Sequence, residues 1–320
     1  MSPVLPDFVL ELGHGIYAVD TGFHRERFDA AYLLVQDGRA AFIDTGTNFA
    51  VPRLLAALQS LGLAHDAVDW VIPTHVHLDH AGGAGALMRQ LPAARMLVHP
   101  RGARHMVDPS ALYEGALAVY GADAMARSYG TLVAVDAARV QVSSDGMTLD
   151  FAGRPLHFID TPGHARHHHC VWDAVSRGWF TGDTFGLSYR EFDNERGAWI
   201  LPTSTPVQFE PEALRHSLQR LLDLEPQRMY VTHFGVVHDV PRLGALLFEL
   251  LDAMVAIGRA QAADTGRHQR MKAALTDLYA GSLKSHGCPM TPTRIAELLA
   301  VDIELNAQGM AAWLDRDLRR

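Results

Sequence analysis

The sequence has few cysteines and few lysines. Its two cysteines, Cys170 and Cys288, are too few for a disulfide framework and are not spaced as in a zinc ribbon, so we interpret both as buried thiols. Lys272 and Lys284 are the only lysines among 28 basic residues. A mechanism that passes through a lysine Schiff base therefore has almost no candidate residue.

The sequence also lacks a basic excess and a long uncharged apolar run. Acidic residues outnumber basic ones by 36 to 28, and the pI is near 6.1, so a broad nucleic-acid-binding face is not expected. The most apolar stretch, residues 243–257, contains Glu249 and Asp252 and falls short of the roughly 20 apolar residues of a membrane span. Residues 1–7 hold two prolines and an acidic residue, and the first basic residue is Arg25, which disfavours a secretory signal. We expect a soluble cytoplasmic protein without a nucleic-acid or membrane partner.

Short apolar strands alternate with helical segments over most of the chain. Asp37 and Gly38 are typical of a hairpin turn, and residues 51–61 carry leucines at helical spacing. This alternation predicts an α/β fold in which packed sheets are covered by helices. The further strand candidates are residues 70–72, 96–98, 132–135, 147–151, 156–159, 170–172, 179–181 and 229–232.

Beyond about residue 240 the pattern predicts helices alone. Residues 243–257 place their apolar side chains on one helical face, and further helices are expected near 267–280, 292–301 and 303–318. Thr291 is the expected cap of the helix that begins at Pro292. The predicted division is a main domain of residues 1–238 and a helical region of residues 239–320.

A dense group of ionisable residues follows the strand that ends at Ile72. Within six residues the chain carries His75, His77, Asp79 and His80. Alternation in an extended segment points His75 and His77 to one side, whereas Asp79 and His80 come after the chain has begun to turn. Burying so many ionisable groups without a cation is costly, so the cluster predicts a metal site that faces two adjacent ions.

Three later segments are built in the same way, because each strand runs directly into one candidate ligand. These ligands are His164, Asp183 and His233. If the strands leave their sheets at a common edge, the ligands converge there. The run His167-His168-His169 is different, since three consecutive histidines do not all face one site. We leave that run outside the ligand set, with a supporting hydrogen bond as its alternative role.

The segments T-H-V-H-L-D-H-A-G-G, T-P-G-H, F-T-G-D-T and V-T-H-F follow one another in the order and approximate spacing of the metallo-β-lactamase superfamily. The chain resembles this family over about residues 14–235. The resemblance implies a four-layer αββα sandwich as the catalytic domain, here followed by the C-terminal helical extension. It also implies one metal ion held by His75, His77 and His164, a second held by Asp79, His80 and His233, and Asp183 as the bridge between them.

The resemblance further implies hydrolysis. Imidazole and carboxylate ligands suit zinc, our first expectation, and also iron or manganese. Two divalent ions about 3.5–4 Å apart share a water and lower its pKa to about 7. The bridging hydroxide is expected to attack a small ester, thioester or lactone, and the catalytic role of passing a proton is assigned to Asp79.

Departures from known branches narrow this expectation. True metallo-β-lactamases lack the bridging aspartate, which disfavours antibiotic hydrolysis. Homoserine-lactone hydrolases usually carry a tyrosine where this chain has Gly186, and Tyr189 is the nearest phenol. The basic glutathione-binding pattern of glyoxalase II enzymes and the basic exosite of nuclease members are not found. Two alternatives stay open: a mononuclear iron oxygenase acting on a persulfide or thiol, and a non-catalytic metal-bound sensor.

A long connection, residues 185–209, leaves the candidate ligand Asp183. Loops of this length are often functional, so a substrate pocket is predicted here. Its aromatic side chains either line an apolar acyl pocket or fasten the loop down. The apolar face of the C-terminal helices suits either a lid or a homodimer contact. The predicted pocket residues are Phe185, Tyr189, Arg190 as an anion contact, and Trp199.

Overall fold

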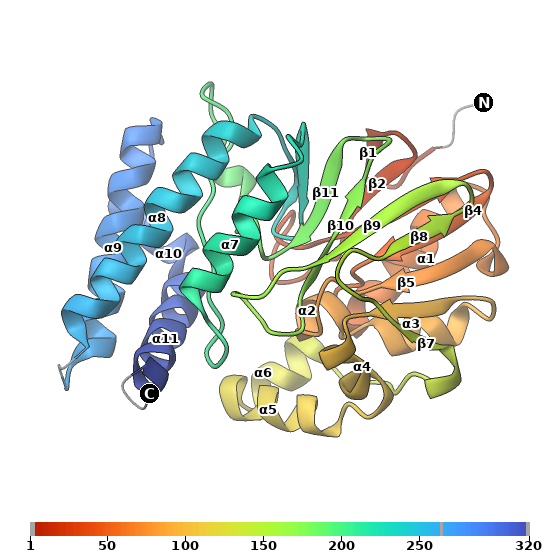
Figure 1. The fold of residues 1–320 in the computed structure, drawn as a ribbon, viewed down its shortest axis with the longest axis horizontal. Coiled ribbons are helices and arrows are strands. Elements are labelled where there is room, and N and C mark those ends of the chain that lie inside the picture. The colour runs from red at the N-terminus through yellow and green to blue at the C-terminus, as the bar shows by residue number, and fades with distance from the viewer. Residues whose placement is uncertain (1–3, 263–264, 318–320) are drawn as a thin grey trace. The chain divides into compact units, whose positions relative to one another are not determined.

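The computed structural model describes residues 4–262 and 265–317, and the chain divides into two compact units (Figure 1). The first unit contains the described residues up to Asp160, together with His167–Gly182 and Tyr230–Val236. The second contains Thr161–Arg166, Asp183–Met229 and the described residues from Val237 onward. The sequence-based boundary at residue 238 stays a prediction.

The first sheet has seven strands in chain order, and it is mixed. The four N-terminal strands are antiparallel neighbours, and the later ones pair in parallel. Asp37 and Gly38 join the third and fourth strands with φ angles of 48° and 76°, as a mirror-image hairpin turn requires, which confirms that prediction. The strands are β1 (Val9–Gly13), β2 (Ile16–Asp20), β3 (Ala30–Gln36), β4 (Arg39–Ile43), β5 (Val68–Ile72), β6 (Arg95–Val98) and β7 (Val140–Val142).

The second sheet has six strands in the order β13-β12-β11-β10-β9-β8. The four from β8 to β11 are antiparallel neighbours. All the strands predicted from residue 147 onward therefore exist. Their bounds are β8 (Thr148–Phe151), β9 (Arg154–Asp160), β10 (His169–Asp173), β11 (Gly178–Gly182), β12 (Arg228–Val231) and β13 (Gly235–Val237).

Strand β3 shows why the sheets pack face to face. Its side chains alternate, so Tyr32 and Leu34 enter a core shared by both sheets, whereas Leu33 enters a core on the opposite face. The shared core includes Phe158 and Phe180 from the second sheet. The other core is closed by buried residues of three helices: α1 (Val51–Ser60), α3 (Ala84–Gln90) and α4 (Pro100–Val107).

The strand predicted at residues 132–135 is wrong. This segment is irregular, and the place beside β6 is taken by β7. The Val135 amide donates to the Met106 carbonyl at 2.8 Å, and a methyl group on Gly85 would collide with the Val133 carbonyl. The segment therefore contacts helices α3 and α4, but only Val135 is buried, whereas Leu132 and Val133 are half-buried and Ala134 is exposed. A short apolar run does not by itself distinguish such a segment from a strand.

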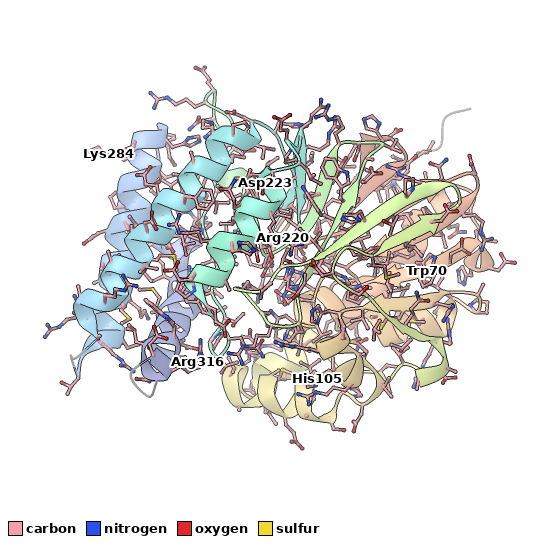
Figure 2. The ribbon with its side chains drawn as sticks, in the orientation of Figure 1. Trp70, His105, Arg220, Asp223, Lys284 and Arg316 are labelled. Carbon is pink, nitrogen blue, oxygen red and sulfur yellow. The ribbon has the colours of Figure 1, made fainter. Side chains whose placement is uncertain are left out.

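The second unit carries the predicted C-terminal helices. Thr291 accepts a hydrogen bond from the Arg294 amide, which confirms the predicted cap. Arg316 on the last helix donates to the carbonyls of Val207 and Phe209, and Figure 2 labels Arg316. The helices are α7 (Pro211–Leu222), α8 (Val240–Gln261), α9 (Arg267–His286), α10 (Pro292–Leu298) and α11 (Ala300–Asp317).

Two expectations about exposure have different outcomes. Cys170 is buried as predicted, but Cys288 is only partly buried, because it follows the end of α9 at Gly287. Among residues 4–262 and 265–317, no helix combines the length and the apolar character needed to cross a membrane.

Candidate metal centre

The predicted ligands follow the ends of strands, as the sequence indicated. His75 comes after β5, and helix α2 (Leu78–Ala81) begins directly after His77. Asp79 and His80 therefore lie on a helical turn, and the chain has turned where we predicted. The three later ligands come within four residues of the ends of β9, β11 and β12 and are His164, Asp183 and His233.

Asp79, His80 and His233, all in the first unit, form a compact group of potential ligands. One donor atom from each lies within 4.8 Å of the others. The Asp79 Oδ2 atom is 3.4 Å from His233 Nε2 and 3.9 Å from His80 Nε2. Both imidazoles are buried, whereas the Asp79 side chain is 24% exposed. The carboxylate is thus the solvent-facing member of this group.

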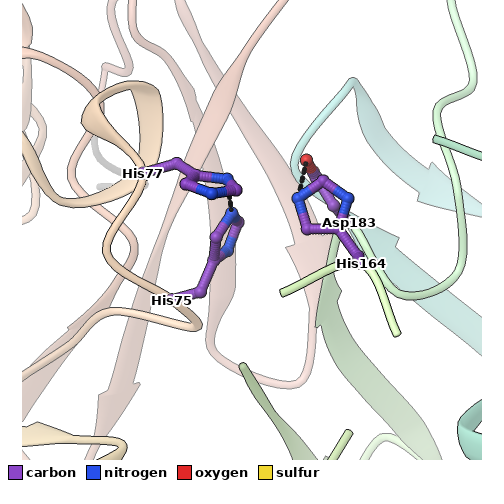
Figure 3. A group of neighbouring side chains, drawn as sticks. All are labelled: His75, His77, His164 and Asp183. Atoms are coloured by element: carbon purple, nitrogen blue, oxygen red, sulfur yellow. Dashed lines mark hydrogen bonds and ion pairs between the residues drawn. The ribbon is translucent and has the colours of Figure 1, made fainter. Parts of the chain in front are cut away.

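The other four predicted ligands form one close pair in each unit, and Figure 3 draws both pairs. In the first unit, His75 Nε2 is 2.7 Å from His77 Nδ1, and the two rings are nearly perpendicular. In the second unit, His164 Nε2 is 3.3 Å from Asp183 Oδ2, and both side chains are buried. Within each pair, the two potential ligand atoms therefore lie next to each other.

Gly163 sets the position of His164 in the T-P-G-H segment. Its φ of 129° is unfavourable for other residues, and a methyl group there would lie 2.2 Å from the Leu214 amide nitrogen. The Gly163 carbonyl accepts a hydrogen bond from the Glu210 amide. The loop can therefore pack against the start of α7 only because residue 163 has no side chain.

Asp44 is a buried acid in contact with a candidate ligand, and the sequence analysis missed it. Its carboxylate is buried and accepts hydrogen bonds from His80 Nδ1, from the Thr74 amide and hydroxyl, and from the Thr232 hydroxyl, at 2.7–3.0 Å. Asp44 follows β4 directly, just as the ligands follow their strands. That same signal, a polar residue at the end of an apolar strand, was present in the sequence.

Asp29 is a second buried acid near this group that the sequence analysis missed. The Thr21 hydroxyl donates to its carboxylate at 2.8 Å. Burial raises the pKa of Asp29 to about 7, against the opposing effect of His233 and His80. Asp29 follows the charged stretch Arg25-Glu26-Arg27, so in the sequence it does not stand out from a solvated loop.

The histidines are oriented to bind a cation. The Nδ1 atoms of His164 and His233 donate to the carbonyls of Thr203 and Phe28, and His80 Nδ1 donates to Asp44. In a neutral imidazole whose Nδ1 carries the proton, Nε2 keeps its lone pair. Such a second hydrogen bond is the usual support of a metal-binding histidine. The donor set and its tautomers therefore fit divalent metal ions.

The His167–His169 run divides between two surroundings, as expected of consecutive residues. The ring of His168 stacks on His75 with centroids 4.7 Å apart, and the ring of His167 meets His77 edge-on at 5.2 Å. His169 instead places Nδ1 2.7 Å from the Ser143 hydroxyl. Two members of the run therefore pack against candidate ligands.

The predicted pocket residues lie in the second unit, where Phe185, Tyr189 and Trp199 are fully buried. The Tyr189 hydroxyl donates to Asp302 on α11 at 2.9 Å, and the Trp199 indole donates to Ser282 on α9 at 3.0 Å. Arg190 is partly exposed and pairs with Asp193 at 3.2 Å. These contacts attach the loop to the C-terminal helices, and the role of the loop as a substrate pocket stays a prediction.

The comparisons with known proteins agree with this geometry. The family model described as the metallo-beta-lactamase superfamily matches residues 24–233. The chain belongs to the metallo-beta-lactamase superfamily. This superfamily member is 30% identical over 176 residues to a metallo-beta-lactamase fold-containing protein of Sulfurisphaera tokodaii, a match that covers 54% of this chain and only 62% of that protein. It is 28% identical over 280 residues to the hydroxyacylglutathione hydrolase of Acidiphilium cryptum, covering 87% of this chain and 85% of that enzyme.

Solved structures confirm the predicted metallo-β-lactamase fold of this superfamily member. An archaeal superfamily protein from Sulfolobus tokodaii has a TM-score of 0.62 at 26% identity, covering 76% of this chain and 87% of the other. A metallo-beta-lactamase family protein from Thermus thermophilus has a TM-score of 0.63 at 22% identity, covering 97% and 95%. The second likeness extends over the C-terminal helices as well.

Proposed function

We propose that this superfamily member is a hydrolase that uses two divalent metal ions, with zinc as the first candidate, to cleave a small ester, thioester or lactone. One ion is assigned to the two pairs drawn in Figure 3, and the other to the group of Asp79, His80 and His233. Asp183 is assigned as the bridge between the ions. The ligands of the first ion are His75, His77, His164 and Asp183.

The orientation of His80, His164 and His233 is the observation that carries the proposal. Each has its Nδ1 atom held by a buried acceptor of its own unit. With Nδ1 engaged in this way, the Nε2 lone pair of each ring is left to bind a metal ion, which is the usual arrangement of a metal-binding histidine. The name of the Acidiphilium relative, a hydroxyacylglutathione hydrolase, supports a hydrolytic reaction at such a site.

Two bound ions would lower the pKa of water and polarise the carbonyl of the substrate. The chain's own residues supply the rest. Asp44, through His80, keeps one imidazole fixed, so that no reorientation is needed when charge develops. Asp79 is the solvent-facing carboxylate of its group, and we assign this carboxylate the transfer of a proton to the leaving group.

The test combines elemental analysis with one substitution and its matched control. We expect about two metal ions per chain in untreated protein and hydrolysis of at least one ester, thioester or lactone, with an acyl-glutathione thioester included. Asp183→Ala should lose metal and lower the rate on the order of 100-fold or more. Asp223→Ala changes an exposed aspartate of the same unit, labelled in Figure 2, and should leave both unchanged.

Three results would contradict the proposal. Metal-loaded protein that hydrolyses none of these substrates is not such a hydrolase. One iron per chain with oxygen uptake on a persulfide or thiol identifies an oxygenase instead. A tightly retained small molecule without turnover identifies a sensor.

A further inference from the structure

A chain of aromatic rings begins at the ligand group of the first unit. The Phe28 ring meets the His233 ring edge-on, with centroids 5.2 Å apart. His24 then packs on Phe28 at 5.3 Å and on Phe23 at 4.0 Å. Phe23 and Phe28 are buried, whereas His24 is exposed. The loop between β2 and β3 therefore presents one exposed ring supported by two buried ones.

The ring chain continues away from the ligand group. Phe23 packs on the buried Tyr129 at 5.5 Å, and Tyr129 packs on Tyr120 at 5.2 Å. Tyr120, at the end of helix α5 (Ser110–Tyr120), is 38% exposed. The Phe49 ring is 56% exposed and reaches Gly130, where an added methyl group would lie 3.4 Å from Phe49 Cζ. This series of packed rings therefore ends in exposed aromatic side chains.

Helix α5 adds an apolar surface beside these rings. Its residues are predominantly apolar, yet each of them is at least partly exposed in the structure. Tyr113 and Val119 are among the exposed large side chains of the first unit. An apolar helix that buries none of its residues gains free energy when a ligand covers it.

Electrostatic effects connect this surface with Asp79. The pKa of His24 is lowered, chiefly by partial desolvation of the ring, while the Asp79 carboxylate raises it and His233 lowers it. Asp79 also raises the pKa of Tyr129, after burial and Tyr120. The geometric link between the surface and the ligand group is the Phe28 ring, which packs on both His233 and His24.

We infer that the exposed aromatic surface made by His24, Phe49 and Tyr120 binds the apolar acyl part of the substrate while its scissile carbonyl lies at the group of Asp79, His80 and His233. The inference rests on the proposed hydrolase function and names its substrate class. Phe49 and Tyr120 carry no charge, so an anionic acyl substituent gains nothing from them. An alkyl or aryl group is instead stabilised by removing apolar area from water.

The experiment compares p-nitrophenyl esters from acetate to octanoate on metal-loaded protein. We expect kcat/KM to rise about two- to fourfold for each added CH2, the range expected when a methylene group is partly to fully buried. The double variant Phe49→Ser, Tyr120→Ser should flatten this dependence, with the largest loss of kcat/KM on the octanoate ester. Val175→Ser removes an exposed apolar side chain of the same unit and should keep the dependence of the parent protein.

A binding measurement separates this inference from the hydrolase proposal. Octanoate should bind metal-loaded parent protein at least tenfold more tightly than acetate, measured by calorimetry, and the double variant should lose that preference. One outcome separates the two proposals: no ester is hydrolysed, but the parent protein binds octanoate more tightly than acetate and the double variant does not. In that case the hydrolase proposal is wrong, and the inferred acyl-binding surface is supported. A flat chain-length dependence in the parent, or an unchanged preference in the folded double variant, overturns the inference.

Discussion

The carboxylate of Asp44 accepts a hydrogen bond from His80 Nδ1 at 2.8 Å, in a region where both side chains are buried. The same carboxylate accepts from Thr74 and Thr232, so it joins three segments that are distant in the sequence. The Asp44 backbone has a φ of 56°, which is uncommon for a residue with a side chain. The surrounding hydrogen bonds thus stabilise an unfavourable backbone conformation that places the Asp44 carboxylate beside His80 Nδ1.

Asp44→Asn should weaken metal binding without removing a ligand. Because the amide lacks the charge that holds the His80 tautomer, we expect about 10- to 100-fold lower metal affinity, measured by competition with a chelator. Asp69→Asn breaks a partly exposed pair with Arg39 and should cost at most about 1 kcal/mol of unfolding free energy, with metal affinity unchanged. Equal metal affinity in the Asp44 variant and the parent would contradict the role given to Asp44.

Gly163→Ala should destabilise the protein and displace His164. The added methyl group meets the Leu214 backbone at 2.2–2.3 Å, and the positive φ is unfavourable as well, so a loss of about 1–3 kcal/mol is expected in chemical denaturation. Gly281→Ala is the matched control. It lies on an exposed part of α9 with nothing within 4 Å of the new methyl group, and it should stabilise by about 0.5–1 kcal/mol. A neutral Gly163 variant would show that the loop adjusts freely.

His169 should make stability depend on pH. Burial, with a smaller contribution from His99, lowers its pKa to about 3, whereas an unfolded histidine titrates near about 6.5. The unfolded chain therefore binds this proton first, and unfolding free energy falls as the pH drops from about 6.5 toward 3, by up to about 1.4 kcal/mol per pH unit. His169→Gln should reduce that slope, measured by urea unfolding between pH 7 and pH 5. An identical slope in both proteins would contradict the assignment.

Metal ions should raise the melting temperature, because they bind the folded site alone. Zinc at about 100 times its dissociation constant contributes about 2.7 kcal/mol, which is several degrees for a chain of this size. His233→Ala should lose most of the increase measured by calorimetry. His157→Ala changes a histidine on β9 that contacts Thr148 outside the ligand group, and it should retain the full increase. A metal-induced increase that survives His233→Ala would place the ion elsewhere.

Much of the site was predictable because its residues share one local signal. His75, His164, Asp183 and His233 each follow an apolar strand, and that pattern can be read without knowing which strands become neighbours. Asp44 carries the same signal and was overlooked because a single carboxylate after a strand usually lies in a solvated turn. The prediction of a strand at residues 132–135 was wrong, because the Val135 amide bonds to the Met106 carbonyl of a helix and makes no strand ladder.

The sequence by itself determined the family, the ligand types and the strand ends that carry them, because these depend on residue identity and on short-range alternation. Only the tertiary structure decided that Asp44 lies under His80, that Tyr189 and Trp199 bond to the C-terminal helices, and that the rings of His24 and Tyr120 belong to one aromatic chain. Those relationships join residues separated by up to 113 positions. They depend on how sheets and helices pack, and no local pattern encodes a contact of that range.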